Sequence, residues 1–252
     1  MIENTQVQNK LTGKQAELEL KLKTYFVDLC SERVGGETLS CSDDFFAEME
    51  NLLKPGRGIF IDDKYTERGK WMDGWESRRK RVKGHDWAVI KLGKSGIIRG
   101  FEIDTAHFTG NFPPFASVEL ANSSQEIPHD DDWHEVIPKT DLQGDSQHFF
   151  GLEDMSEIWT HVRLHIYPDG GVARLRVYGH VFIDWDTFDT SKTIDLAALE
   201  YGGRGVYAND VHFGVPENLI APGKGVNMGD GWETRRRRAP GNDWFGLALA
   251  PA

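Results

Sequence analysis

The sequence has few cysteines and no long apolar run. Its two cysteines, Cys30 and Cys41, are too few for a disulfide framework and have no second pair at metal-ligand spacing. Reduced thiols and a cytoplasmic location are therefore expected. No run approaches the roughly eighteen apolar residues of a membrane span, and the amino terminus has no apolar segment behind its charges, so neither a span nor a signal peptide is expected.

Positive charge is also scarce, since the net charge is −11 at pH 7. Nucleic-acid backbones and anionic membranes attract proteins with a positive surface field. We therefore expect neither as a partner, and the basic runs that do occur must act locally.

One sequence word occurs twice. DGWESRRKRVKGHDW at 73–87 returns 157 residues later as DGWETRRRRAPGNDW at 230–244, with ten identities in fifteen positions. Upstream, ENLLKPGRG at 50–58 matches ENLIAPGKG at 217–225, and the change of offset gives the first copy ten extra residues within 59–72. A period of this length is that of a whole domain, which predicts two homologous repeats.

The repeat sets the expected domain organisation. The second copy is too short to bury a sandwich core by itself, so we expect its repeat to be cut short. The expected parts are an N-terminal extension with a short helix (1–34), a complete first repeat (35–180), a connection (181–201) and the start of a second repeat (202–252).

Local patterns predict an all-β sandwich after one helix. Residues 1–13 are polar and expected to fray, whereas 14–29 are rich in helix formers and place Leu18, Leu22 and Tyr25 near one face. Leu196–Leu199 allow one helical turn in the connection. Short apolar or alternating runs broken by turn residues predict strands at 58–61, 87–92, 97–103, 117–120, 159–166 and 172–178.

The strongest strand signal is a hairpin. Apolar residues alternate with polar ones through 159–166 and again through 172–178, with a Pro-Asp-Gly-Gly turn between them. Arg174 and Arg176 fall on the polar face of the second strand. For His161 and His165, a solvated strand face is preferred over a site.

The basic run of the repeated word offers a candidate anion site. Guanidinium groups of Arg78 and Arg79 can bind a carboxylate through paired hydrogen bonds. The alternative is a salt-bridge network that maintains the fold, which suits its presence in both copies. The sequence leaves these two interpretations open.

The segment 101–114 carries the other concentrated chemistry. Glu102 and Asp104 alternate onto one face of a strand, and His107, Thr109 and Asn111 follow in a loop rich in Gly and Pro. A carboxylate beside an imidazole suits general acid–base catalysis. A satisfied polar network is the alternative, and Asp104 with His107 supplies only half of a metal site.

His85 is a further candidate because it does not repeat. The second copy has Asn242 at this place, whereas the neighbouring Asp86 and Trp87 are retained as Asp243 and Trp244. The retained pair is interpreted as structural and His85 as part of a site.

Several long sequence segments, occurring in the same order, resemble allantoicase, a ureide-degrading hydrolase family built from two homologous repeats. The matching segments are 35–56, 69–81, 85–93, 100–114, 160–179 and 229–244. The resemblance implies galactose-binding-like jelly-roll domains. It also implies hydrolysis of allantoate to ureidoglycolate and urea in purine (allantoin) catabolism.

The resemblance suggests roles for the candidate residues. The acid would be His107 or His85, and the base would be Asp104 or Glu102. The clamp for the substrate carboxylate would be Arg78 or Arg79, and the ureido arms would meet Thr109 and Asn111. No cofactor is implied, activation by a divalent metal stays open, and the full-length family implies a homo-oligomer.

Two other function classes remain at this point. One is a noncatalytic β-sandwich module that binds a small anion or a carbohydrate, since fold alone does not define function. The other is an inactive pseudo-subunit that assembles with a complete homologue. Release of urea from allantoate separates the enzyme from both.

Overall fold

A computed structural model describes residues 13–250 apart from 190, 192 and 226, so the expected fraying of 1–12 lies outside the described residues. The chain is mostly β-structure with one described α-helix, α1 (Lys14–Tyr25). The strands are β1 (Val27–Asp28), β2 (Glu37–Cys41), β3 (Tyr65–Thr66), β4 (Gly69–Lys70), β5 (Trp75–Glu76), β6 (Asp86–Asp104), β7 (Phe115–Ala121), β8 (His134–Asp141), β9 (Gln147–Gly151), β10 (Trp159–Tyr167), β11 (Gly171–Val172), β12 (Arg174–Val181), β13 (Arg204–Ala208) and β14 (Phe245–Ala248).

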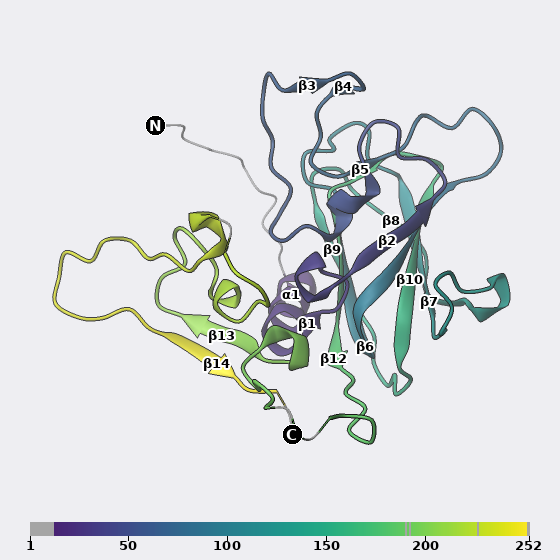
Figure 1. The fold of residues 1–252 in the computed structure, drawn as a ribbon. Helices are drawn as coiled ribbons and strands as arrows, with labels where there is room; N and C mark the ends of the chain where they lie inside the picture. The colour runs from purple at the N-terminus through teal and green to yellow at the C-terminus, as the bar shows by residue number, and fades with distance from the viewer. Residues whose placement is uncertain (1–12, 190, 192, 226, 251–252) are drawn as a thin grey trace.

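The long strand β6 joins the two layers of the sandwich (Figure 1). Its first half pairs with β2 and β10, and its second half pairs with β12 and β9. It turns the corner near Gly93 and Gly96, where an added Cβ would lie 2.4 Å and 2.2 Å from backbone carbonyl oxygens. The result is a five-stranded layer, β2–β6–β10–β7–β8, and a four-stranded layer, β1–β12–β6–β9.

The inner faces of the layers form the core. Phe101 and Ile103 of β6 pack with Leu175 and Val177 of β12 and with Leu164 of β10, all fully buried. The alternation in 159–166 and 172–178 accounts for these positions. The expected all-β jelly-roll sandwich is confirmed. The strands expected at 159–166 and 172–178 are present as β10 and β12, but the expected hairpin is wrong, because β10 pairs with β6 and β7 whereas β12 pairs with β6 and β1 in the other layer. The solvated strand face is also wrong for His161, which is 1% exposed.

Some local expectations are wrong. Residues 58–61 form no strand, and the predicted strands 87–92 and 97–103 are the two halves of β6. The helix ends at Tyr25, because Phe26 is extended and β1 pairs with β12. Tyr25 is 56% exposed, so only Leu18 and Leu22 face the protein. The helical turn of the connection is a 3-10 turn at Leu199–Tyr201.

The outer face of the four-stranded layer is buried and charged, whereas the outer face of an antiparallel sheet usually meets water. We call it the charged face. Segment 54–58 and helix α1 lie over it, together with residues 199–225 and 227–250, which include β13 and β14 and which we call the second-copy segment (Figure 1). Its central members are Glu102 and Asp104 of β6 and Arg174, Arg176 and Tyr178 of β12.

The remaining described helices are short 3-10 turns at Glu32–Val34, Met49–Leu53, Asp130–Asp132, Leu199–Tyr201, Pro216–Leu219 and Met228–Asp230. None of the helices in the described part of the chain has the length and apolar character needed to cross a bilayer.

Candidate functional site

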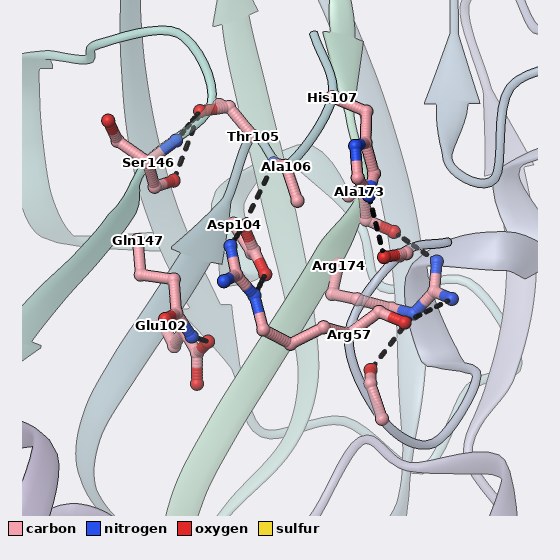
Figure 2. Close-up of polar contacts among 12 residues, drawn as sticks. Arg57, Glu102, Asp104, Thr105, Ala106, His107, Ser146, Gln147, Ala173 and Arg174 are labelled. Atoms are coloured by element: carbon pink, nitrogen blue, oxygen red, sulfur yellow. Dashed lines mark hydrogen bonds and ion pairs between the residues drawn. The ribbon is translucent and has the colours of Figure 1, made fainter. Parts of the chain in front are cut away.

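Asp104 and Arg57 form the ion pair at one end of the charged face (Figure 2). Arg57 donates from Nε to Oδ2 at 2.9 Å and from Nη2 to Oδ1 at 3.1 Å. The carboxylate is fully buried, whereas the Arg57 side chain is 35% exposed. Asp104 also accepts from the backbone of Ala106. The pair therefore holds a partly exposed guanidinium in a fixed orientation.

A second ion pair supports the first. Arg174, buried beside Asp104 in the sheet register, donates from Nη2 to Asp73 Oδ2 at 2.6 Å. It also donates to the carbonyl oxygens of Asp73, Ala173 and Gly56. Asp73 in turn accepts from the backbone N–H of Ile59. These bonds attach segment 56–59 to the sheet, and they satisfy the buried charges.

His107 lies just beyond the end of β6 and meets the same segment. Its ring Nε2 is 3.0 Å from the Gly58 carbonyl oxygen, which can only accept, so Nε2 carries a proton. Its backbone N–H donates to the Asp145 carboxylate. Its ring stacks on the Phe60 ring, with 5.7 Å between the ring centroids. The φ of 68° is a left-handed conformation uncommon outside glycine. The ring is thus held at the edge of the charged face.

Glu102 faces the same side of β6 as Asp104, as predicted, but it meets different partners. It accepts from the Tyr178 hydroxyl at 2.8 Å and from Gln147 at 2.5 Å, and Lys23 lies 3.6 Å away. Both of its carboxylate oxygens therefore already accept a hydrogen bond within the protein. Burial raises the pKa of Tyr178 well above its usual value, so its phenol remains a proton donor to Glu102.

Glu76 and Asn111 pair where β5 meets the loop after β6. Asn111 is exposed and donates from Nδ2 to Glu76 Oε1 at 2.7 Å. The Asn111 carbonyl oxygen accepts from the Gly171 N–H at 2.7 Å, so the loop is fixed to β11. Burial raises the pKa of Glu76 by more than the Asn111 hydrogen bond lowers it. Thr109 is exposed on the same loop.

The Arg78 side chain is bound to Asp43, which lies in another loop. It donates from Nε to Asp43 Oδ2 at 2.7 Å, and its backbone N–H donates to Oδ1 at 2.8 Å. Phe45 lies 5.1 Å from its guanidinium. Arg79 is exposed, and its side chain makes no hydrogen bond or ion pair with the part of the chain that is described. Of the two predicted clamps, Arg78 thus already holds a carboxylate of the protein.

The second copy reproduces this arrangement. In each copy the arginine side chain donates to an aspartate carboxylate. The tryptophan ring N–H donates to the backbone carbonyl oxygen of the same aspartate, at 2.9 Å in the first copy and 2.7 Å in the second. The matching sets are Asp43, Trp75 and Arg78 in the first copy and Asp210, Trp232 and Arg235 in the second. These contacts explain the repetition of the word as structural.

His85 lies on the opposite layer. Its Nε2 is 2.9 Å from Nδ1 of His165, whose Nε2 is 2.7 Å from Glu119, and its ring packs on Tyr167 at 4.4 Å. His165 and Glu119 belong to the outer face of β10 and β7. The structure therefore gathers Asp104, Glu102 and His107 on the charged face and separates His85 from them.

Several residues with site-like surroundings were not predicted from the sequence. Arg57 comes 47 positions before its partner Asp104, so spacing alone does not connect them. The repeat did contain a signal for these residues, because both copies keep the charge at each position: Arg57 matches Lys224, and Glu76 matches Glu233. Among the described residues, no group of three or more His, Cys, Asp or Glu side chains is arranged to hold a metal ion.

Comparison with known proteins identifies relatives over nearly the whole chain. The family description "Allantoicase repeat" matches residues 27–182 and 194–252. Probable allantoicase 1 of Burkholderia mallei is 54% identical over 226 residues, which are 89% of this chain and 67% of the relative. Probable allantoicase of Photobacterium profundum is 50% identical over 225 residues, 89% of this chain and 68% of that protein. The solved allantoicase of Saccharomyces cerevisiae superposes with a TM-score of 0.80 at 37% identity, covering 96% of this chain and 75% of that structure.

Proposed function

Because the chain belongs to the allantoicase family, we propose that it hydrolyses allantoate to ureidoglycolate and urea at the end of the first repeat where β6 stops and β12 begins. We call this end, formed by 56–60, 73–78, 104–114 and 168–173, the loop end. The observation that carries this placement is the partly exposed Arg57 guanidinium, oriented by buried Asp104 beside His107. The reaction belongs to purine (allantoin) catabolism.

Arg57 suits the substrate carboxylate better than the arginines of the repeated word. Asp104 occupies Nε and Nη2, and Nη1 forms no hydrogen bond with the residues that are described. An incoming carboxylate can bind there without breaking the ion pair. Asp104 and Glu102, whose oxygens already accept hydrogen bonds, then serve as positioning residues.

Each ureido arm of allantoate carries a carbonyl acceptor and N–H donors. Asn111 offers both an amide N–H₂ and a carbonyl, and Thr109 offers a hydroxyl, on the loop that begins at His107. The Gly171 bond to the Asn111 backbone fixes this loop. We assign these two residues to a ureido arm.

His107 is assigned as the acid and Glu76 as the base. Protonated His107 gives the proton of its Nδ1 to the nitrogen of the departing ureido group and keeps its Nε2 proton on the Gly58 carbonyl oxygen. The lone pair of the other ureido nitrogen forms a C=N bond as the C–N bond breaks and urea leaves. Water then adds to the same carbon and gives its proton to Glu76, which yields ureidoglycolate. The raised pKa of Glu76 makes it a stronger base than an ordinary carboxylate.

The test is urea release by purified His107→Asn protein. We expect kcat to fall by about a hundredfold or more, because general acid–base groups contribute roughly that much. His180→Asn, an exposed histidine at the far end of β12, is the matched control and should keep its activity. Equal thermal unfolding of both variants and the wild type excludes misfolding as the cause. Turnover by His107→Asn within tenfold of the wild type contradicts the assignment.

We further propose a cytoplasmic enzyme that forms homo-oligomers, with the first repeat at 35–180 and the second from 202. The reduced cysteines, Cys30 and Cys41, support the cytoplasmic placement. Light scattering of the purified chain tests the assembly state.

A further inference from the structure

A cavity of about 280 Å³ lies between the charged face and the second-copy segment, and it shares only Gly56 with the loop end. Helix α1, β1 and β12 form one wall, and residues 199–217 form the other. Four cationic side chains and two acidic ones line it. A site with this excess of positive charge attracts an anion.

Arg176 is the buried anchor of this cavity. It is 8% exposed, and its Nη2 donates to the carbonyl oxygens of Lys54 and Gly56 at 2.6 Å and 2.5 Å. Its Nη1 lies 3.4 Å from Asp28 Oδ2 and has no hydrogen-bond partner among the described residues. A buried guanidinium N–H without a hydrogen bond is costly, so a ligand oxygen at this place is favoured.

Two further arginines approach from the sides. Arg204 of β13 donates from Nε to the carbonyl oxygen of Thr24, a bond that fixes the side chain and spares its two terminal nitrogens. Arg33 bonds Asn218 of the second-copy segment. Guanidinium groups from both copies therefore border one cavity, an arrangement suited to a carboxylate.

Acceptors and apolar groups complete the lining. Asp28 and Glu217 can accept from N–H donors of a ligand, and Leu199 and Val215 cover a short carbon chain. Burial raises the pKa of Asp28, although Arg176 opposes this effect. The volume lies just below the usual range for drug-sized ligands, so a molecule of roughly ten heavy atoms fits.

We propose that this cavity binds a small carboxylate that also carries N–H donors, such as a ureido acid, and that the bound ligand holds the two copies together. The carboxylate lies among Arg176, Arg204 and Arg33, and the N–H groups meet Asp28 and Glu217. Because both copies contribute, binding stabilises their docked arrangement by mass action.

The probe is N-carbamoylglycine, a stable ureido carboxylate, measured by calorimetric titration and by thermal unfolding of the full chain. Acetate lacks the N–H donors and methylurea lacks the carboxylate, so both should bind at least about tenfold more weakly, as expected for lost charge-assisted hydrogen bonds. Arg204→Gln and Arg33→Gln should each weaken probe binding at least about tenfold. Arg235→Gln, an exposed arginine of the same segment, is the matched control and should bind normally.

Arg176→Lys keeps the charge and provides a check where a neutral variant unfolds, and it too should bind the probe more weakly. Glu76→Gln and His107→Asn, at the loop end, should retain cavity binding. Probe binding that is unchanged in Arg204→Gln and Arg33→Gln overturns the inference, and so does equal binding of acetate. Loss of urea release with intact probe binding would count against the proposed function and leave this inference standing.

Discussion

At the scale of single residues, Arg78 of the repeated segment 73–87 joins two loops through its hydrogen bonds to Asp43. Asp43 accepts hydrogen bonds from the backbone N–H groups of Phe45 and Arg78 and from the Arg78 side chain. Partial burial raises the pKa of Asp43, but the bonds from Arg78 outweigh it and hold the pKa below its usual value. A carboxyl with a lowered pKa stabilises the fold above its ordinary pKa, and this contribution is lost as the pH falls through the lowered value.

We therefore predict that Asp43→Asn lowers the free energy of unfolding near neutral pH by about 1–2 kcal/mol, as expected for lost hydrogen bonds to a charged group. Because the wild type loses this contribution in acid, the difference between the two proteins should shrink as the pH falls below 3.8. Chemical denaturation across pH measures it. Asp44→Asn, at the neighbouring carboxylate, is the control, and a difference for Asp43→Asn that does not vary with pH would refute the prediction.

Glu76 gives a second pH prediction. A base must be ionised, so kcat/KM should fall as the pH drops through the pKa of Glu76, which burial places above 4.5. Glu76→Gln should lower kcat by about a hundredfold to ten-thousandfold and remove this limb of the profile. Its repeat counterpart offers a matched control, since Glu233→Gln changes the same word in the second copy. An acid limb that persists in Glu76→Gln would assign the titration to another group.

At the scale of elements, the outer face of β10 carries a hydrogen-bonded chain from His85 through His165 to Glu119. Burial lowers the pKa of His85, and the neighbouring His165 and Lys80 lower it further. Burial also lowers the pKa of His165, although Glu119 opposes the shift. The folded protein thus resists protonation of this pair more than the unfolded chain does, so stability is lost as the pH falls below 6.5.

His85→Asn, the residue that the second copy has at this place, should make stability less dependent on pH between 6.5 and 5. Thermal unfolding at several pH values tests this, with exposed His212→Asn as the control. Because His85 lies on the outer face of the opposite layer from Arg57 and His107, we also expect its variant to turn over allantoate within about threefold of the wild type. A loss of a hundredfold would instead support His85 as the acid.

The elements also show what a sequence can predict here. Alternation in β10 and β12 was sufficient to predict both strands and their apolar faces, because a side-chain period of two is a local property. It did not show that the polar face of β12 is covered, since the cover comes from residues 54–58 and from the second copy. For the same reason Glu102 and Asp104 were correctly placed on one face, but their partners Tyr178 and Arg57 were not identified.

At the scale of the whole molecule, the second-copy segment is part of the first repeat's core. Leu199 and Ile220 are each 9% exposed and join the main hydrophobic cluster, and the Leu199 N–H donates to the Ile220 carbonyl oxygen. Phe245 and Leu247 of β14 pack against the same cluster. Shared burial of this kind couples the two parts into one cooperative unit.

Leu199→Ala should therefore weaken the docking of the second-copy segment. The loss of a buried leucine side chain costs about 2–4 kcal/mol, and the cost should fall on the docked arrangement more than on the sandwich. Hydrogen exchange at β13 and β14 measures it, because their amides open when the segment undocks. Leu219→Ala removes a leucine that is 52% exposed in the same segment and should change exchange by less than about 0.5 kcal/mol. Equal effects of the two substitutions would mean that Leu199 does not hold the segment in place, and that the cover of the charged face depends on the polar contacts of Arg33 and Arg204 instead.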